Sequence, residues 1–347
     1  ARGLDPAVRD GLQRAIYNVA AVASAVMERG GPRAVEFARH RVLLRESPVA
    51  RAGVYVPGGR APYPSTVVMG VVSARAAGVE HVAVCAPPGS DGELDPVILG
   101  ACGLTGASAV YRMGGAQAVA ALAHGTESVG AVQVIVGPGN LYVQEAKRQV
   151  LGQVGIDGFA GPSDLVAIAD AGIDPRPLAL DLLAQAEHGP GSLVIAISSS
   201  SELLDQLDSS LQGARDTGAL ARLAWVPDLE LALALAQALA PEHLQLLGPQ
   251  AEQLAPRVTC AGCVFVGTAA GTAFGDYIAG SNHILPTGGA ARFASGLSPL
   301  HFLRCFAEVR IDDAGELARA AAPVARAEGF ELHARSMEAR IRDNGTG

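Results

Sequence analysis

The chain has 347 residues, of which 49% are hydrophobic and 17% charged, and its formal net charge is −8. This composition excludes a disordered chain and supplies enough apolar surface for more than one core. The acidic balance argues against a nucleic-acid surface, and no apolar run of about 18 residues indicates a membrane span. Residues 1–31 lack the order of features of a secretory signal. Five scattered cysteines then favour a reducing, cytoplasmic location.

The N-terminal part predicts one amphipathic helix over residues 5–28. Asp5 is a suitable N-cap, a proline follows it, and apolar residues recur at helical spacing. Gly30-Gly31-Pro32 ends the helix, and the charged stretch Arg33–Arg45 shows no clear pattern. We interpret residues 1–52 as an N-terminal helical segment.

From Gly53 onward, short apolar strands alternate with helices of about a dozen residues, as right-handed crossovers require. The first series of expected strands comprises Val54–Val56, Val82–Cys85, Ala109–Arg112 and Gln133–Val136. The second comprises Leu165–Ala169, Leu193–Ile197, Leu223–Val226, Leu244–Leu247 and Val264–Val266. The two series predict an α/β fold with two Rossmann-like, doubly wound parallel-sheet domains, over residues 53–160 and 161–297. The tail, residues 298–347, predicts a strand at Ala307–Ile311 and one or two helices.

Three glycine-rich loops follow strands of the first series. They contain Tyr55-Val56-Pro57-Gly58-Gly59, Gly114-Gly115-Ala116-Gln117 and Gly137-Pro138-Gly139-Asn140. Glycine lets the backbone approach a ligand, and a helix start offers free N–H groups to an anion. None of the three is a G-x-G-x-x-G motif, and each alone is ordinary turn chemistry. Three in one domain favour a binding cleft.

A leucine-rich helix is predicted to end at Ala184-Gln185-Ala186-Glu187-His188. Gln185 and His188 are three residues apart and share a helix face, whereas Glu187 lies about 100° round from His188. This pair could hold a metal. The alternative is a histidine that caps the last carbonyls of the helix.

Glu242 and His243 directly precede an apolar strand. An adjacent carboxyl and imidazole at the mouth of a sheet suit proton transfer, because imidazole titrates near neutral pH. Either residue could equally be a surface residue at the start of a strand.

Further polar residues stand in loops and in the tail. The segment GDYIAGSNHILPTGG, residues 275–289, concentrates Asp276, Asn282 and His283 between glycines. Ser163 lies in the turn between the two predicted domains, and Glu328 and His333 lie in the tail. The pair Cys260 and Cys263 runs straight into an apolar strand, which favours a structural role over a metal or redox role.

Nine strings, in one order from Gly53 to about Arg340, together resemble the histidinol dehydrogenase family of histidine biosynthesis. They are GVYVPGG with APYPSTVVMG, GGAQAVAAL, VGPGNLYVQEAKR, GPSD, AQAEH, APEHL, AGCVFVG, GDYIAGSNHILPT and EGFELHA. The resemblance implies oxidation of L-histidinol to L-histidine through the aldehyde, with reduction of two NAD, as the last step of that pathway.

The resemblance also implies the roles of individual residues. One Zn²⁺ per site would be held by Gln185, His188, Asp276 and His333, and would bind the imidazole and amino nitrogens of the substrate. His243 would be the base and Glu242 would activate water. Other expected substrate contacts are Ser163, His283 and Glu328, beside His243 and the metal ligands. The expected NAD contacts are Tyr55, Gln117 and Asn140.

The family forms an intertwined homodimer whose C-terminal tail crosses to the other subunit. Glu328 and His333 would then complete the partner's site, and no nucleic acid or membrane is expected as a partner.

The amino end departs from the family, which carries more residues before VYVPGG; this is either a shortened homologue or a chain that omits a natural N-terminal region. Two alternatives stay open: a relative that oxidises another amino alcohol, and a non-catalytic two-domain binding protein.

Overall fold

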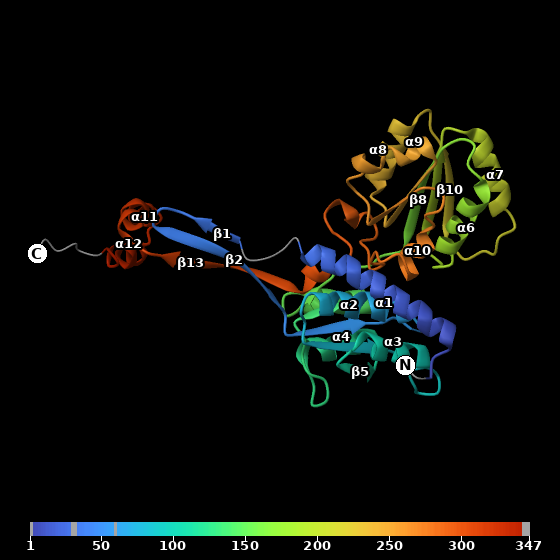
Figure 1. Ribbon diagram of the computed structural model, residues 1–347. Coiled ribbons are helices and arrows are strands. Elements are labelled where there is room, and N and C mark those ends of the chain that lie inside the picture. Colours follow the sequence, from blue (N-terminus) through green and yellow to red (C-terminus); the bar gives the residue numbers. More distant parts are fainter. Residues whose placement is uncertain (1–2, 29–32, 59–60, 342–347) are drawn as a thin grey trace, which may run out of the picture. The chain divides into compact units, whose positions relative to one another are not determined.

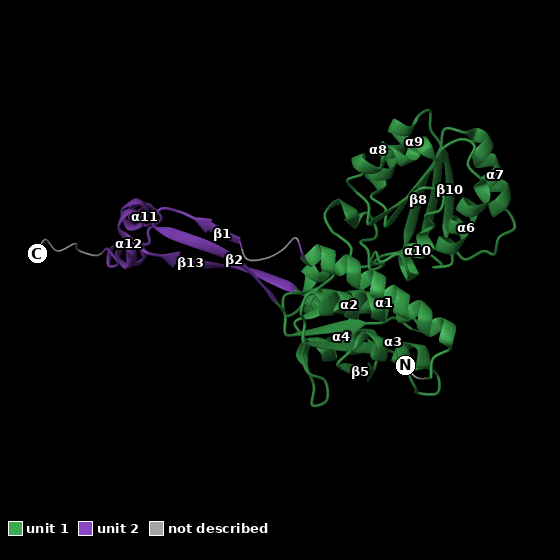
Figure 2. Ribbon diagram, in the orientation of Figure 1, with its two compact units in different colours: residues 1–27, 48–302 green, residues 28–47, 303–347 purple. Residues whose placement is uncertain are grey.

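The computed structural model describes residues 3–28, 33–58 and 61–341. Two compact units divide the chain (Figure 2). Unit 1 comprises the described residues within 1–27 and 48–302, and unit 2 comprises those within 28–47 and 303–347. Among the described residues, no helix is long and apolar enough to cross a bilayer.

The first sheet of unit 1 contains five parallel strands in the order β5-β4-β3-β6-β7. The strands are β3 (Arg51–Tyr55), β4 (His81–Ala86), β5 (Ala109–Arg112), β6 (Val134–Val136) and β7 (Gly155–Ile156). The helices around it are α1 (Pro6–Met27), α2 (Pro64–Ala76), α3 (Pro96–Thr105), α4 (Gly115–His124) and α5 (Leu141–Val150). The four predicted strands are confirmed, and the two-residue strand β7 is added at the edge.

The second sheet repeats this topology with the order β10-β9-β8-β11-β12, again with parallel pairing. Its strands are β8 (Asp164–Ala169), β9 (Leu193–Ser198), β10 (Leu220–Trp225), β11 (His243–Leu247) and β12 (Cys263–Val266). Its helices are α6 (Pro175–Ala186), α7 (Ser201–Leu211), α8 (Leu229–Leu239), α9 (Pro249–Glu252) and α10 (Thr272–Tyr277). Three short 3₁₀ helices complete unit 1: η1 (Ala255–Arg257), η2 (Ala290–Arg292) and η3 (Pro299–Phe302). The predicted doubly wound α/β class is therefore confirmed, while the expected division at residue 161 stays a prediction.

The strand sequences are continuous apolar runs because helices cover both faces of each sheet (Figure 1). In β8, Leu165 and Ala167 pack with α6 and α7 on one face. Val166 and Ile168, which alternate with them, pack with α8 on the other face. Successive strand residues point to opposite faces, so an apolar residue is needed at every position.

Gly70 of α2 lies tightly against β3, because a Cβ atom there would lie 2.6 Å from Cγ1 of Val54. We expect Gly70→Ala to lower the free energy of unfolding by about 1–3 kcal/mol. Gly11→Ala in α1 is the matched control: no atom lies within 4 Å of its added Cβ, so helix propensity alone raises stability by up to about 1 kcal/mol. Urea denaturation compares the two variants. Equal stabilities would contradict the close packing of α2 on β3.

Unit 2 is a three-stranded sheet, order β1-β2-β13, with two helices. Its elements are β1 (Arg33–Glu36), β2 (His40–Pro48), β13 (Leu303–Ile311), α11 (Gly315–Ala327) and α12 (Glu331–Glu338). The predicted tail strand and helices are confirmed. The interpretation of residues 1–52 as a helical segment holds only for α1; the charged stretch Arg33–Arg45, which showed no clear pattern, forms strands because β2 pairs with β13 from the far end of the chain.

Candidate active site

The predicted catalytic residues lie at the amino edge of the second sheet. Ser163 precedes β8, His243 is the first residue of β11, and β11 pairs with β8 through His243 and Leu165. Gln185 lies in the last turn of α6, and a crossover helix runs back to this edge of a parallel sheet. The sheet therefore brings together residues as far apart in the chain as Ser163 and Glu242, 79 positions.

A chain of hydrogen bonds connects these side chains. The Gln185 amide donates to the Ser163 hydroxyl, which donates to Oε2 of Glu242. The backbone N–H of Asp164 also donates to Oε2 of Glu242, at 3.2 Å, and Oδ1 of Asp164 accepts from the backbone N–H of Glu242 at 2.7 Å. Gln185 and Glu242 are buried. The carboxyl group of Glu242 is thus held in one orientation before any ligand arrives.

Each ring nitrogen of His243 lies 3.6 Å from a carboxylate oxygen, Nδ1 from Glu242 and Nε2 from Asp276, and the backbone binds only Nδ1. Its Nδ1 lies 3.3 Å from the carbonyl oxygen of Asp164, a distance at which an N–H donates. Its Nε2 lies 3.6 Å from Oδ1 of Asp276 and, among the described residues, is buried without a hydrogen-bond partner. In this tautomer Nε2 carries the lone pair, so it is the atom that can accept a proton from a ligand.

The cluster shifts the pKa values of its members. Burial raises the pKa of Glu242 to about 7, against the opposing effects of His243 and Ser163. Burial alone would lower the pKa of His243, but the carboxylates of Asp276 and Glu242 raise it above its usual value. Burial works against ionisation of Asp276 as well, and the facing His243 nevertheless lowers its pKa. A carboxyl group whose pKa is raised to about 7, beside an imidazole whose pKa is also raised, is suited to proton transfer.

The raised pKa of Glu242 predicts a pH-dependent stability. The folded chain holds this proton more tightly than the unfolded chain, so the stabilising contribution is present below the usual pKa of 4.5 and is lost as the pH rises through about 7. In chelator-treated protein we expect Glu242→Gln to be more stable than the parent by roughly 3 kcal/mol above pH 8, and equal to it near pH 4. Urea denaturation across this pH range measures the difference. Glu80→Gln, at an exposed glutamate, is the control, and parallel pH profiles for parent and Glu242→Gln would contradict the prediction.

The loop after α10 is anchored to the first half of unit 1. Nδ1 of His283 lies 2.9 Å from the carbonyl oxygen of Asp276, and its Nε2 lies 3.2 Å from Oγ1 of Thr66 in α2. Burial lowers the pKa of His283, which favours the neutral ring. The amide of Asn282 donates to the Met69 carbonyl and to Ser73, so this side chain anchors the loop to α2.

A buried glutamine, which sequence reasoning missed, supports the same site. Gln245 lies two residues after His243 on β11 and therefore on the same face of the sheet. Its amide donates to Oδ2 of Asp181 at 2.6 Å and to the Ala270 carbonyl at 3.3 Å. Asp181 lies one turn before Gln185, and Ala270 directly precedes the loop into α10. The signal was present in the sequence, as a polar residue inside the apolar run of β11.

Three of the four predicted metal ligands lie in unit 1. The amide nitrogen of Gln185 donates a hydrogen bond to Ser163, so the amide oxygen is the atom that can coordinate a metal ion. Asp276 lies near enough to His188 for the imidazole to contribute to its lowered pKa. Amide oxygen, imidazole nitrogen and carboxylate oxygen are donor types that fit zinc. Within the described ranges, no three His, Cys, Asp or Glu residues form a group that could hold a metal ion; the three unit 1 ligands include only two residues of those types.

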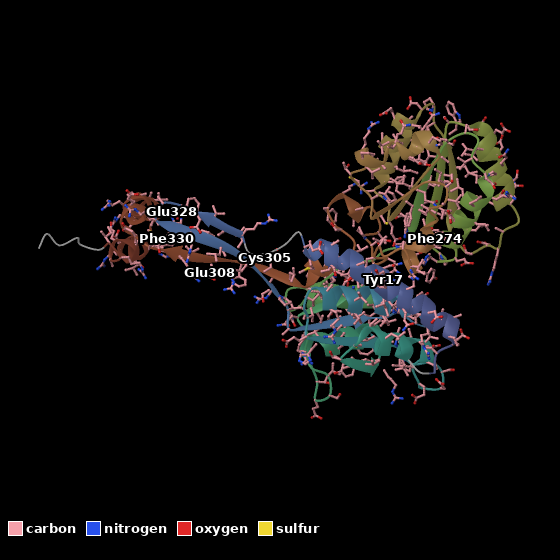
Figure 3. All side chains as sticks on the ribbon, in the orientation of Figure 1. Tyr17, Phe274, Cys305, Glu308, Glu328 and Phe330 are labelled. Carbon is pink, nitrogen blue, oxygen red and sulfur yellow. The ribbon has the colours of Figure 1, made fainter. Side chains whose placement is uncertain are left out.

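The fourth predicted metal ligand, His333, and the predicted substrate contact Glu328 belong to unit 2. His333 is an exposed residue of α12, and its ring makes an edge contact with Phe330, with ring centroids 5.1 Å apart. Glu328, labelled with Phe330 in Figure 3, is exposed at the C-cap of α11. Their exposure leaves both side chains accessible to another surface.

The predicted NAD residues lie at the carboxyl edge of the first sheet. Tyr55 is buried, and its hydroxyl accepts from the backbone N–H of Gly115 at 3.0 Å. Asn140 caps α5, its Oδ1 accepting from the backbone N–H groups of Tyr142 and Val143. Because β3 and β6 are neighbours in the strand order, the loops after them leave the sheet at its topological switch point, where open α/β sheets bind ligands.

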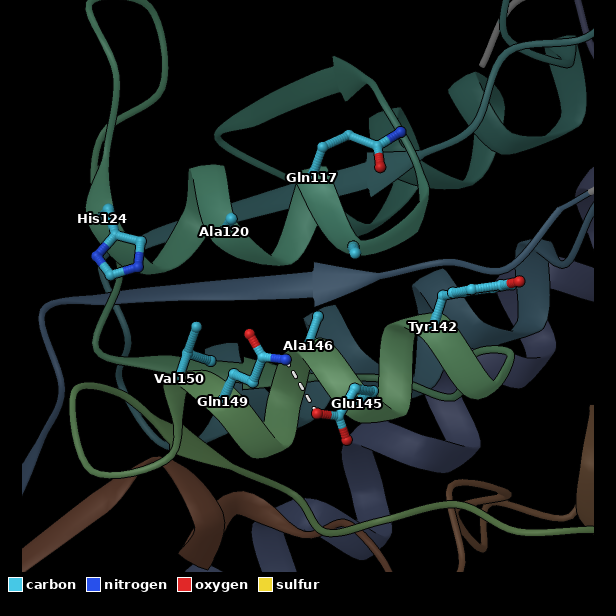
Figure 4. Close-up of a pocket in the computed structure, with 9 residues that line it drawn as sticks. Gln117, Ala120, His124, Tyr142, Glu145, Ala146, Gln149 and Val150 are labelled. Atoms are coloured by element: carbon cyan, nitrogen blue, oxygen red, sulfur yellow. Dashed lines mark hydrogen bonds between the residues drawn. The ribbon is translucent and has the colours of Figure 1, made fainter.

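Gln117 is exposed and lines a groove between α4 and α5 (Figure 4). The groove has a volume of about 490 Å³, and its other lining residues include Tyr142, Glu145, Gln149 and His124.

The carboxyl edge of the second sheet binds a helix of the protein itself. There Asp170, after β8, accepts from the backbone N–H groups of Gln250 and Ala251 and so caps the protein's own helix α9.

Comparisons with known proteins show the family of the chain. A family model described as histidinol dehydrogenase matches residues 1–341. A histidinol dehydrogenase of Parasynechococcus marenigrum is 47% identical over 86% of this chain and 71% of its own length, and one of Haloarcula marismortui is 42% identical over 96% and 82%. The crystal structure of histidinol dehydrogenase from Elizabethkingia anophelis is similar, with a TM-score of 0.91 and 31% identity over 97% of this chain and 81% of that one. The chain belongs to the histidinol dehydrogenase family of oxidoreductases.

Proposed function

We propose that this protein oxidises L-histidinol to L-histidine, using two NAD as hydride acceptors, as the last step of histidine biosynthesis. The observation that carries the proposal is Nε2 of His243, a buried base atom that has no hydrogen-bond partner among the described residues and faces Asp276. The family assignment supplies the substrate class. The pKa of Glu242 is raised to about 7 and that of the adjacent His243 is also raised, an arrangement that suits proton transfer.

In the first oxidation, the alcohol loses a hydride to NAD and its proton to Nε2 of His243, which gives the aldehyde, NADH and a proton. Nδ1 of His243 stays bonded to the Asp164 carbonyl, so the ring keeps its orientation. In the second oxidation, water adds to the aldehyde with Glu242 as its base. The hydrate then loses a second hydride to NAD, again with His243 as base, and the carboxylate is formed.

Gln185, His188, Asp276 and His333 would hold zinc, with one ion per site. When bound, zinc supplies a Lewis acid that holds the imidazole and amino nitrogens of histidinol. Ser163, His283 and Glu328 are proposed substrate contacts, and the partly buried Ser163 and His283 are already oriented by Gln185 and Thr66. Tyr55, Gln117 and Asn140 are the proposed NAD residues.

Because the family exchanges tails, we propose a cytoplasmic homodimer in which Glu328 and His333 complete the partner's site. Both residues are exposed within unit 2, in agreement with a role toward a second chain. No nucleic acid or membrane is part of this proposal.

The test is NADH formation from histidinol by zinc-loaded protein, before and after treatment with a chelator. We expect two NADH for each histidinol consumed, loss of turnover with chelator, and recovery with added zinc. No NADH from zinc-loaded dimer would refute histidinol oxidation and favour the relative that acts on another amino alcohol, or the binding protein. Turnover that resists the chelator would refute the zinc assignment alone.

A further inference from the structure

Lys147 in α5 is an unusual residue, because its charged side chain is only 1% exposed. Its Nζ donates to Oδ1 of Asp157 at 2.6 Å, and the side chain of Asp157 is only 6% exposed. A buried ion pair is costly to form, since both charges lose their water. The other hydrogen bonds of Lys147 and Asp157 therefore indicate what the pair stabilises.

Both members of the pair bind one glycine. Nζ of Lys147 donates to the carbonyl oxygen of Gly137 at 2.6 Å, and Oδ2 of Asp157 accepts from the backbone N–H of Gly137, also at 2.6 Å. The two polar backbone groups of Gly137 are thus fixed by two opposite charges. Charge-assisted hydrogen bonds of this kind are roughly twice as strong as neutral ones.

Gly137 is held where only glycine fits. Its φ is +115°, and a Cβ atom there would lie 2.0 Å from the carbonyl oxygen of Tyr55. The backbone after β6 therefore lies directly against the end of β3. Gln144, one turn before Lys147, adds a bond from its amide to the Gly139 carbonyl at 3.2 Å. Side chains of α5, the helix that follows the loop Gly137–Asn140, thus hold the loop in place through hydrogen bonds.

This loop joins two of the proposed NAD residues. At its start Gly137 contacts the backbone of Tyr55, and at its end Asn140 caps α5. The ammonium of Lys147 already has two acceptors and is not exposed to a ligand. The ammonium of Lys147 therefore binds the loop and Asp157 and does not bind a phosphate of the cofactor.

We infer that Lys147 and Asp157 are positioning residues for the dinucleotide: they fix the loop Gly137–Asn140 against Tyr55 and thereby set NAD affinity without touching NAD. This inference rests on the proposed function, because it takes Tyr55 and Asn140 as NAD contacts. The pair sits in the first half of unit 1, so it acts on the cofactor and leaves histidinol binding unchanged.

The experiment separates positioning from stability by comparing single and double variants of the zinc-loaded protein. Lys147→Met and Asp157→Leu each leave one buried charge without its partner, so both are expected to lower the melting temperature and to weaken NAD binding. The double variant Lys147→Met/Asp157→Leu removes both charges, and replacing a buried pair by apolar residues is often neutral for stability. We expect its melting temperature to return toward that of the parent while the NAD dissociation constant stays raised by about tenfold or more, since the bonds to Gly137 are still missing.

Isothermal titration with NAD gives the dissociation constant, and steady-state kinetics give KM for NAD and for histidinol separately. Asp157→Asn keeps an acceptor for Gly137 and is the mild variant, expected to fold and to raise the NAD dissociation constant about threefold. Arg257→Met is the control: Arg257 is exposed, pairs with Glu230 at 2.5 Å and lies on η1, away from the first sheet, so NAD affinity should not change.

A double variant with restored melting temperature and parental NAD affinity would overturn the inference, as would an Asp157→Asn protein that folds and binds NAD like the parent. An equal rise in KM for histidinol would also overturn it, because the effect would then be general. A parent protein that binds no NAD at all would instead refute the proposed function.

Discussion

Replacing His243 with alanine is expected to abolish NADH formation from histidinol, with kcat lowered by about 10²–10⁴-fold, the usual contribution of general base catalysis. The reason is the position of Nε2, which faces Asp276 at 3.6 Å and is the ring atom left for the proton of the alcohol. The zinc content of the variant is expected to equal that of the parent, because His243 is not among the proposed ligands. Stopped assays for NADH and metal analysis of the same preparation measure both quantities.

His81→Ala is the control for this prediction, since His81 is an exposed residue at the start of β4. It is expected to leave both turnover and zinc unchanged. A His243→Ala protein that loses zinc would show that His243 is a ligand and not the base. A variant that keeps its zinc and turns over at the parental rate would refute any catalytic role.

Replacing His188 with alanine is expected to weaken zinc binding by more than roughly 100-fold, because loss of an outer-shell partner alone costs about 10–100-fold. His188 follows the last turn of α6, near enough to Asp276 to contribute to the lowered pKa of that carboxyl. Turnover is expected to fall in parallel and to recover partly at high zinc concentration. Competition with a chromogenic chelator measures the affinity.

Glu187→Ala is the matched control, one residue away at the C-cap of the same helix and equally exposed. A carboxylate is a more usual zinc ligand than the amide of Gln185, so this pair of variants tests the assignment directly. Zinc loss in Glu187→Ala with retention in His188→Ala would reverse the proposed ligand set.

Much of the fold was predictable because the relevant information is local. Each strand of the two parallel sheets is a short apolar run between turn residues, and such runs appear in the sequence whether or not the partner strand is known. The nine strands predicted between Val54 and Val266 are confirmed, with ends that differ by at most three residues. Unit 2 shows the limit: β2 becomes a strand by pairing with β13, which lies more than 250 residues away.

The candidate site divides in the same way. Helical spacing alone selected Gln185 with His188, and adjacency alone singled out Glu242 and His243, while their roles rested on the resemblance to the family. Chain order gave no indication that Asp164 holds the ring of His243 or that Asp276 faces it. The carboxyl-edge rule also pointed only to the first sheet, whereas the cluster around His243 lies at the amino edge of the second.

The sequence by itself thus determined the α/β class, the two series of strands, the glycine-rich loops and the family. Those features depend on residue spacing and on the φ values that glycine permits, which are properties of short segments. Only the tertiary structure decided which polar atoms are buried, which are bonded and which remain for a ligand. Buried contacts such as Lys147 with Asp157 and Gln245 with Asp181 join elements that the fold, and not the chain, places side by side. Burial raises the pKa of Glu242, and the position of Asp276 decides what Nε2 of His243 faces; both exist only once the second sheet and its helices have formed.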